Sequence, residues 1–174
     1  AQIIHVDIDP ASISKLVNAH FPIVGDVKSV VLEMMESVSL IHSHKYESWR
    51  ETIKNFAQLH PLAYHEDTPN IKPQWVIERV GELLGDRANI STDVGQHQMW
   101  AAQFYPFTRP RQFISSGGLG TMGFGFPAAL GVKVASPEKI SINFTGDGSI
   151  LMNCQELMTA VEKQIPVINI ILNN

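Results

Sequence analysis

The stretch Lys139-Ile140-Ser141-Ile142-Asn143-Phe144-Thr145, followed at once by Gly146-Asp147-Gly148-Ser149, decides the fold. Lys139–Thr145 predicts a β-strand, and a helix follows that begins at Ser149 or Asn153 and runs through Lys163. Ligands of parallel α/β sheets bind at the carboxyl ends of the strands. Two glycines allow close approach of a ligand, and a helix start offers free N–H groups. The motif therefore predicts a phosphate-binding loop.

The acid inside this loop indicates a metal ion. A carboxylate at Asp147 repels phosphate unless a divalent cation lies between them, and Mg²⁺ is commonly held by one or two protein oxygens plus phosphate oxygens. The next strand, Pro166–Leu172, ends at Asn173-Asn174, and Asn174 lies 27 residues after Asp147. This is a natural length for a crossover between parallel strands. Each motif alone reads equally well as a turn, but together they predict Mg²⁺ between Asp147 and Asn174.

Upstream segments repeat the alternation of strands and helices. A helix is expected from Pro73 to Gly85, and strands at Ala88–Val94 and Gln112–Ser115. Nearer the N-terminus, strands are expected at Gln2–Ile8 and Pro22–Asp26, with a helix capped by Ser12 between them and a helix over Val27–Leu40. This order predicts an α/β fold of parallel sheets with crossover helices.

Residues 41–70 have the composition of a linker between domains. Their apolar side chains Tyr46, Trp49, Ile53 and Phe56 are spaced to line one face of a single amphipathic helix. The segment also holds four histidines, which are His42, His44, His60 and His65. No carboxylate or cysteine stands at ligand spacing from them, so we expect solvated histidines and no metal site.

A second glycine-rich loop lies in Ser116–Ala129. It contains the dinucleotide pattern Gly118-x-Gly120-x-x-Gly123, but the acid that should bind a ribose is misplaced, because Glu138 precedes its strand. We therefore expect a backbone cradle for phosphates. Met122 lies either beside the ligand or in the core, and the residues alone favour the core.

Length and charge exclude several classes of protein. The chain has 174 residues, 44% apolar and 17% charged, with a net charge of −4. The low charged fraction predicts that other protein covers much of the surface, in an oligomer or by further segments. Thirteen basic residues form no stripe, which excludes nucleic acid, and no apolar run is long enough to cross a membrane. The single cysteine gives no reason to assume an oxidising compartment, and a reducing cytoplasm or organelle stroma is the default expectation.

The two glycine motifs carry a family resemblance. Gly146–Ser149 followed by Asn173-Asn174 is similar to the diphosphate motif of thiamine diphosphate enzymes. Val94–Trp100, together with Gly117–Ala129, resembles the large catalytic subunit family of acetolactate synthase (acetohydroxyacid synthase), in its bacterial form. The resemblance implies that residues 1–40 are the end of an FAD-associated middle domain. It also implies that residues 71–174 are the first, truncated part of a thiamine diphosphate domain, and the abrupt ends of the chain agree with a piece of a longer protein.

The resemblance also implies site residues and three cofactors: thiamine diphosphate, Mg²⁺ and FAD. It assigns Mg²⁺ to Asp147 and Asn174. It assigns thiamine diphosphate contacts to Val94, Gly95, Gln96, His97, Gly120, Met122, Gly146, Gly148 and Ser149. It assigns FAD contacts to Asp7, Ile8, Asp26 and Val27, although each of these acids is as plausibly the end of a turn.

The implied activity is that of a transferase in branched-chain amino acid synthesis. Such an enzyme decarboxylates pyruvate and condenses the two-carbon unit with a second 2-oxo acid, giving 2-acetolactate or 2-aceto-2-hydroxybutyrate. The resemblance further implies an oligomer, at least a dimer with a shared active site, a possible small regulatory subunit, and a bacterial cytoplasmic location. The family's catalytic glutamate has no counterpart in residues 1–174, so no catalytic residue is assigned and the segment alone is expected to be inactive.

Several alternatives stay open at this point. The Gly118–Gly123 pattern also suits a nicotinamide-dependent dehydrogenase, and a non-catalytic flavin or nucleotide module is a third class. Within the thiamine family the alternatives are pyruvate oxidase, glyoxylate carboligase and 2-oxo acid decarboxylases. The Gln96–Trp100 run favours acetolactate synthase among them.

Overall fold

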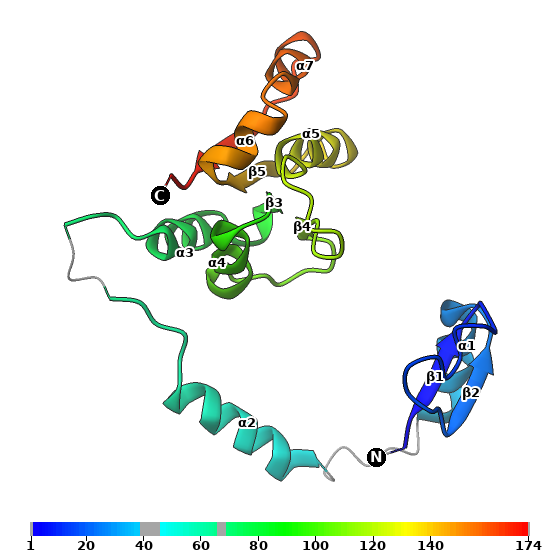
Figure 1. Ribbon diagram of the computed structural model, residues 1–174. Helices are drawn as coiled ribbons and strands as arrows, with labels where there is room; N and C mark the ends of the chain where they lie inside the picture. The colour runs from blue at the N-terminus through cyan, green and yellow to red at the C-terminus, as the bar shows by residue number, and fades with distance from the viewer. Residues whose placement is uncertain (1, 39–45, 66–68, 174) are drawn as a thin grey trace. The chain divides into compact units, whose positions relative to one another are not determined.

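The computed structural model describes residues 2–38, 46–65 and 69–173 (Figure 1). The chain forms two compact units, Ala1–Pro61 and Leu62–Asn174. The family assignments of residues 1–40 and 71–174, with a linker between them, remain a proposal. No helix in the described residues has both the length and the apolar character that a membrane span requires.

The first unit contains a two-stranded parallel sheet. Strands β1 (Ile4–Asp7) and β2 (Phe21–Val24) pair from Ile4 opposite Phe21 to Asp7 opposite Val24, and α1 (Val27–Ser37) follows. The helix predicted after Ser12 is wrong. Residues 10–17 form turns and bends, closed by i→i+3 bonds such as Lys15 N to Ser12 O, and Ser14 has a φ of 60° that a right-handed helix does not accept.

The amphipathic helix expected within residues 41–70 is present. It is α2 (Glu47–Leu59), and the ring of its Phe56 lies against that of His60, with 4.6 Å between the centroids. His42 and His44 lie outside the described residues. Within the described part of the chain, no group of three or more His, Cys, Asp or Glu side chains could hold a metal.

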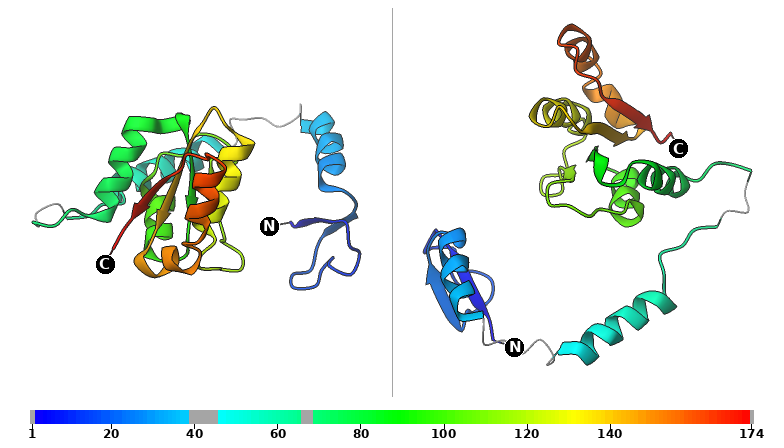
Figure 2. Two further views of the ribbon diagram at one scale, coloured as in Figure 1. Left: turned by 90° about the horizontal axis from the view of Figure 1, so that it is seen from above. Right: turned by 180° about the vertical axis from the view of Figure 1, so that it is seen from behind.

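The second unit is built on a four-stranded sheet of order β4-β3-β5-β6, and all neighbouring strands are parallel (Figure 2). This confirms the α/β class. In chain order its elements are α3 (Pro73–Leu84), the 3₁₀ turn η3 (Gly85–Arg87), β3 (Ala88–Thr92), α4 (Gln96–Phe104), β4 (Phe113–Ser115), α5 (Gly125–Ala135), β5 (Ile140–Thr145), α6 (Asp147–Met152), α7 (Glu156–Glu162) and β6 (Ile168–Ile171).

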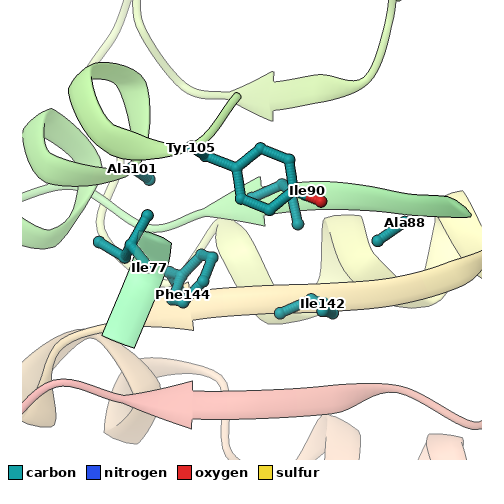
Figure 3. Close-up of a cluster of buried hydrophobic side chains, with 7 residues drawn as sticks. All are labelled: Ile77, Ala88, Ile90, Ala101, Tyr105, Ile142 and Phe144. Atoms are coloured by element: carbon teal, nitrogen blue, oxygen red, sulfur yellow. The ribbon is translucent and has the colours of Figure 1, made fainter. Parts of the chain in front are cut away.

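The two faces of this sheet differ in polarity. One face packs on α3 and α4 through a dry cluster of seven buried side chains, which are Ile77, Ala88, Ile90, Ala101, Tyr105, Ile142 and Phe144 (Figure 3). The alternate strand residues face α5 and are polar. Ser91 Oγ contacts Asn143 Oδ1 at 3.4 Å, and Asn143 donates to Asn169 Oδ1 at 3.0 Å. Because side chains alternate along a strand, the same two central strands supply both the apolar core and this amide ladder.

The first helical turn of α5 lies directly on the sheet. A Cβ at Gly125 would come within 2.4 Å of Asn143 Oδ1 and 2.6 Å of the Asp93 backbone nitrogen. Farther along α5, Ser141 Oγ donates to the Ala129 carbonyl at 2.8 Å. Glycine is therefore required where the helix and the strand ends meet.

One predicted helix is divided. The expected single helix through Lys163 is two helices, α6 and α7, separated by Asn153–Gln155. Asn153 leaves the helical conformation, with φ −134° and ψ 31°, and its side-chain amide donates to the Gly123 carbonyl at 2.7 Å. The break in the helix therefore coincides with a tertiary hydrogen bond from Asn153 to the glycine loop.

Candidate functional site

The sheet has a topological switch point between its two central strands. After β3 the chain passes to α4 on one face, whereas after β5 it passes to α6 and to α7, which packs with α5 on the other face. Thr92 is paired with Phe144, so the two strands end side by side. Loops that leave a parallel sheet in opposite directions open a crevice at the strand ends, where ligands bind.

A cavity of about 230 Å³ lies at this point. Its walls come from the β3–α4 turn, the glycine loop before α5, the β5–α6 turn and the end of β6. The lining residues are Val94, Gly95, Gln96, His97, Trp100, Met122, Gly146, Asp147, Gly148, Ser149 and Leu172. Nine of these were predicted from the sequence as cofactor or metal contacts. Trp100 and Leu172 line the cavity but were not predicted. Gly120 was predicted but does not line the cavity.

The β5–α6 turn presents both polar and backbone groups. Gly146 precedes the first turn of α6, and a Cβ on it would lie 3.2 Å from the imidazole of His97. Asp147 and Gly148 are exposed to the cavity side, whereas Ser149 is buried. The Ser149 hydroxyl has no hydrogen-bond partner among the described residues. A buried hydroxyl without a partner is costly, and a ligand oxygen would satisfy it.

His97 forms the opposite wall. Its side chain is buried, and its Nε2 also lacks a hydrogen-bond partner within the described part of the chain. Burial lowers the pKa of His97 below its ordinary value of 6.5, while a hydrogen bond with the Asp93 backbone and the charges of Asp93 and Asp147 oppose that shift. Burial therefore favours the neutral imidazole, whose Nε2 is left without a partner.

The glycine loop contributes one side chain to the cavity. Met122 is 41% exposed and lines the wall, so the interpretation as ordinary core packing is wrong. Gly120 has a φ of 66° and closes a turn, with its N–H donating to the Ser116 carbonyl at 2.8 Å. The loop therefore reaches the cavity through Met122.

Sequence reasoning passed over Asp93, the residue after β3. This side chain is fully buried, and its two oxygens accept from Gly125 N–H at 2.9 Å and from the Thr145 hydroxyl at 2.7 Å. An acid in an otherwise uncharged strand, two residues before Gly95, was the available signal. Trp100 and Leu172 gave no signal, because apolar residues in a helix or at a strand end normally indicate packing.

The second predicted metal ligand, Asn174, lies outside the described residues. What is described supports the expected order of strands: β6 pairs with β5, and Leu172 N–H donates to the Thr145 carbonyl at 2.9 Å. The chain after β6 is thus hydrogen-bonded next to Gly146 as far as Leu172. Asp147 itself supplies one exposed carboxylate at the cavity.

The remaining predicted residues belong to the first unit, at the carboxyl edge of its sheet. Asp7 Oδ1 accepts from Asp9 N–H at 2.9 Å, and Asp26 Oδ1 caps α1 by accepting from Ser29 N–H at 3.0 Å. Both acids therefore have the local turn roles that the sequence also allowed. Ile8 and Val27, which follow them, are exposed.

Comparisons with known proteins match the part of the chain that forms this cavity to a family model. Residues 93–174, which include all its lining residues, match the family model described as thiamine pyrophosphate enzyme, C-terminal TPP binding domain. These residues are therefore similar to the cofactor-binding domain of thiamine pyrophosphate enzymes. The matched region begins at Asp93, the buried acid beside the cavity, and includes both glycine loops.

Similarity to individual proteins extends over the full chain. It is 49% identical to the acetolactate synthase isozyme 3 large subunit of Escherichia coli, over all of this chain and 31% of that protein. The identity is 47% to a probable acetolactate synthase large subunit of Methanocaldococcus jannaschii and 45% to the chloroplastic acetolactate synthase of Arabidopsis thaliana, with 30% and 26% of those proteins covered. The chain thus spans roughly a quarter to a third of the length of these relatives.

Proposed function

We propose that this chain is a segment of an acetolactate synthase large subunit. The observation that carries the proposal is the extent of the similarity. It covers the first unit, which includes α2, as well as the thiamine pyrophosphate domain. It also reaches relatives from a bacterium, an archaeon and a plant under one enzyme name. A similarity confined to residues 93–174 would fit any thiamine enzyme equally well.

In this proposal the cavity binds the diphosphate end of thiamine diphosphate. Gly146, Gly148 and Ser149 contact the phosphates, and Asp147 with Asn174 holds Mg²⁺. The chemistry of the donors supports this: the unpartnered Ser149 hydroxyl and His97 nitrogen belong to residues that line a glycine-rich cavity, and Asp147 is the one acid of that lining. Hard carboxylate and amide oxygens suit Mg²⁺, which takes its remaining ligands from phosphate and water.

The protein's contribution to the reaction is orientation and exclusion of water. When bound, thiamine diphosphate supplies the carbon nucleophile that attacks the carbonyl of a 2-oxo acid. Val94, Gly95, Gln96 and His97 form one wall, and Met122 supports the cofactor from the other side, with Gly120 in the same loop. His97, neutral because burial lowers its pKa, can accept or donate a hydrogen bond without adding charge to the site. The proposed products are 2-acetolactate from two pyruvates, or 2-aceto-2-hydroxybutyrate when 2-oxobutyrate is the second substrate.

FAD is proposed for the first unit. Asp7 is the last residue of β1, and Asp26 follows the parallel strand β2. Ile8 and Val27 beside them are exposed, so the four residues lie at one edge of the sheet. Each carboxylate retains acceptor capacity beyond the one oxygen used locally, which suits the ribose or amide groups of a dinucleotide.

Further protein completes the active site in this proposal. A cavity of about 230 Å³ is below the roughly 300–1,000 Å³ of usual ligand pockets, and it lacks the family's catalytic glutamate. Several large apolar side chains of the second unit are exposed on α7 and β6, among them Leu157, Val161, Ile168 and Ile171. Such exposure marks surfaces that other protein covers. We propose a homo-oligomer with shared sites, a small regulatory subunit as a further partner, and a bacterial cytoplasmic location.

Product analysis of the full-length protein tests this function. The purified protein is given pyruvate with thiamine diphosphate, Mg²⁺ and FAD, and then with each omitted in turn. The expected result is acetolactate that requires both thiamine diphosphate and Mg²⁺. Acetaldehyde would indicate a decarboxylase, acetyl phosphate an oxidase, and tartronate semialdehyde from glyoxylate a glyoxylate carboligase. Oxidation of a hydroxy acid by NAD without thiamine diphosphate would favour the dehydrogenase.

A further inference from the structure

We propose that Asp93 is a positioning residue that holds together three of the segments forming the cofactor cavity. This inference rests on the proposed cofactor site and adds a residue to it. Asp93 does not line the cavity. The two residues that donate hydrogen bonds to its side chain each lie within three positions of a residue that lines the cavity.

The hydrogen bonds of Asp93 join three separate parts of the chain. Asp93 directly precedes Val94 and the β3–α4 turn. Its Oδ1 accepts from Gly125 N–H at 2.9 Å, three residues after Met122, and its Oδ2 accepts from the Thr145 hydroxyl at 2.7 Å, one residue before Gly146. The Thr145 bond spans 52 residues of sequence. One carboxyl group therefore sets the spacing of the histidine wall, the methionine wall and the β5–α6 turn.

The surroundings make this link geometrically strict. Gly125 can approach because it has no Cβ, and a methyl group there would meet backbone atoms of Thr92 and Asp93 at 2.8 Å and 2.6 Å. Asp93 N–H in turn donates to the Phe144 carbonyl at 3.2 Å, which fixes the strand end from which the side chain projects. A displaced carboxyl would therefore lose both partners.

The environment of Asp93 also argues against a role as a simple ion-pair partner. Its side chain is fully buried, and among the described residues the recorded ion pair, Arg79 with Glu82, is elsewhere. A buried carboxyl group is costly unless hydrogen bonds satisfy it. Here both of its recorded side-chain partners belong to segments that lead into the cavity, which a residue serving only the core would not require.

The structure offers a matched control on the same two elements. Ser141 is also buried, and its hydroxyl also joins β5 to α5, through the Ala129 carbonyl at 2.8 Å. It lies at the opposite end of β5 from the cavity. Ser141→Ala thus removes a comparable buried hydrogen bond while leaving all cavity segments linked.

The test uses the full-length protein with Asp93→Ala, Thr145→Val, Thr145→Ser and Ser141→Ala. The first readout is hydrogen exchange of residues 116–125 and 145–152 in the cofactor-free protein. The second is the Kd for thiamine diphosphate in Mg²⁺, measured by calorimetry, with kcat at saturating cofactor as the third. We expect Asp93→Ala and Thr145→Val to accelerate exchange in both segments and to raise Kd about tenfold, the size of one lost hydrogen bond to a carboxylate.

Thr145→Ser keeps the hydroxyl that donates to Asp93. Its Kd for thiamine diphosphate should therefore stay within about threefold of the wild-type value, because the hydrogen bond is retained. Ser141→Ala should leave exchange in these segments and the Kd unchanged, even if it lowers thermal stability. Equal effects of Ser141→Ala and Thr145→Val, or wild-type exchange and Kd in both Asp93→Ala and Thr145→Val, would overturn the inference. If Asp93→Ala does not fold, the two Thr145 variants decide.

These outcomes separate the inference from the proposed function. A wild-type protein that does not bind thiamine diphosphate contradicts the proposed function, and the positioning role falls with it even if exchange shows the segments linked. A wild-type protein that binds the cofactor, with variants that bind it equally well, contradicts only the positioning role.

Discussion

Asp147 is the acid at the rim of the cavity and the proposed charged ligand of Mg²⁺. Replacing Asp147 by Ala in the full-length protein should raise the Kd for thiamine diphosphate about 100-fold in the presence of Mg²⁺. Even the loss of a residue that only hydrogen-bonds to a metal ligand typically lowers metal affinity about 10–100-fold. Calorimetric titration with and without Mg²⁺ measures this. Glu162→Ala, which removes an exposed acid from α7 in the same crossover, is the control. Similar affinities for both variants would remove Asp147 from the site.

His97 makes stability depend on pH. Burial lowers its folded-state pKa below the ordinary 6.5, so the unfolded chain binds more protons than the native chain between those two values. The stability due to the neutral imidazole is therefore present above pH 6.5 and is lost as pH falls through the folded-state pKa. In the cofactor-free protein, the Tm of wild type should fall more steeply from pH 6.5 to 5 than that of His97→Gln. Parallel curves would contradict the assignment, and His60→Gln controls for loss of an exposed imidazole.

At the residue scale the sequence supported much of the site but missed its supporting contact. Glycines, an acid and a histidine at strand ends indicate ligand chemistry by themselves, and they do line one cavity. Asp93 gave little indication, because its partners Gly125 and Thr145 are distant in sequence and become neighbours only in the folded sheet. The position of Met122 likewise depends on how the glycine loop folds, which the residue type does not indicate.

At the scale of elements, α5 offers a paired test of close packing. Gly125→Ala places a methyl group 2.4 Å from Asn143 Oδ1 and against backbone, so it should destabilise the protein by about 3 kcal/mol. Gly131 lies in the same helix with no atom within 4 Å of an added Cβ, and Gly131→Ala should stabilise by about 0.5–1 kcal/mol through reduced backbone entropy. Thermal unfolding of the full-length variants should rank Gly131→Ala above wild type and Gly125→Ala below it. The reverse order would mean that α5 does not press on the sheet as described.

The alternation of short strand-like segments with helical segments predicted the strands of the second unit and their parallel class. The sequence pattern gave wrong helices where polar contacts determine the local backbone conformation. Ser12 has the residue type of a helix cap, yet the chain there turns back so that Ser14 N–H reaches the ring of His5 at 3.2 Å. The break between α6 and α7 has the same kind of cause, because Asn153 is drawn to the Gly123 carbonyl.

At the scale of the whole molecule, the isolated 174 residues should form no acetolactate from pyruvate, while the full-length protein should. The reason is that the chain supplies the diphosphate-binding half of the proposed site but no catalytic carboxylate for the cofactor ring. A coupled product assay at saturating thiamine diphosphate and Mg²⁺ measures this, with the full-length protein without thiamine diphosphate as the inactive reference. Acetolactate formed by the isolated segment above that reference would contradict the proposal that the catalytic carboxylate lies outside these 174 residues.

The strand order has a consequence for synthesis on the ribosome. β3 lies between β4 and β5, and Asp93, the residue after β3, accepts a hydrogen bond from Thr145, 52 positions later. At about 5–20 residues per second, translation leaves β3 without that neighbour for roughly 3–10 s. During this interval one edge of β3 is unpaired and accessible to chaperones. The nascent domain cannot bind the cofactor until its later half has been synthesised.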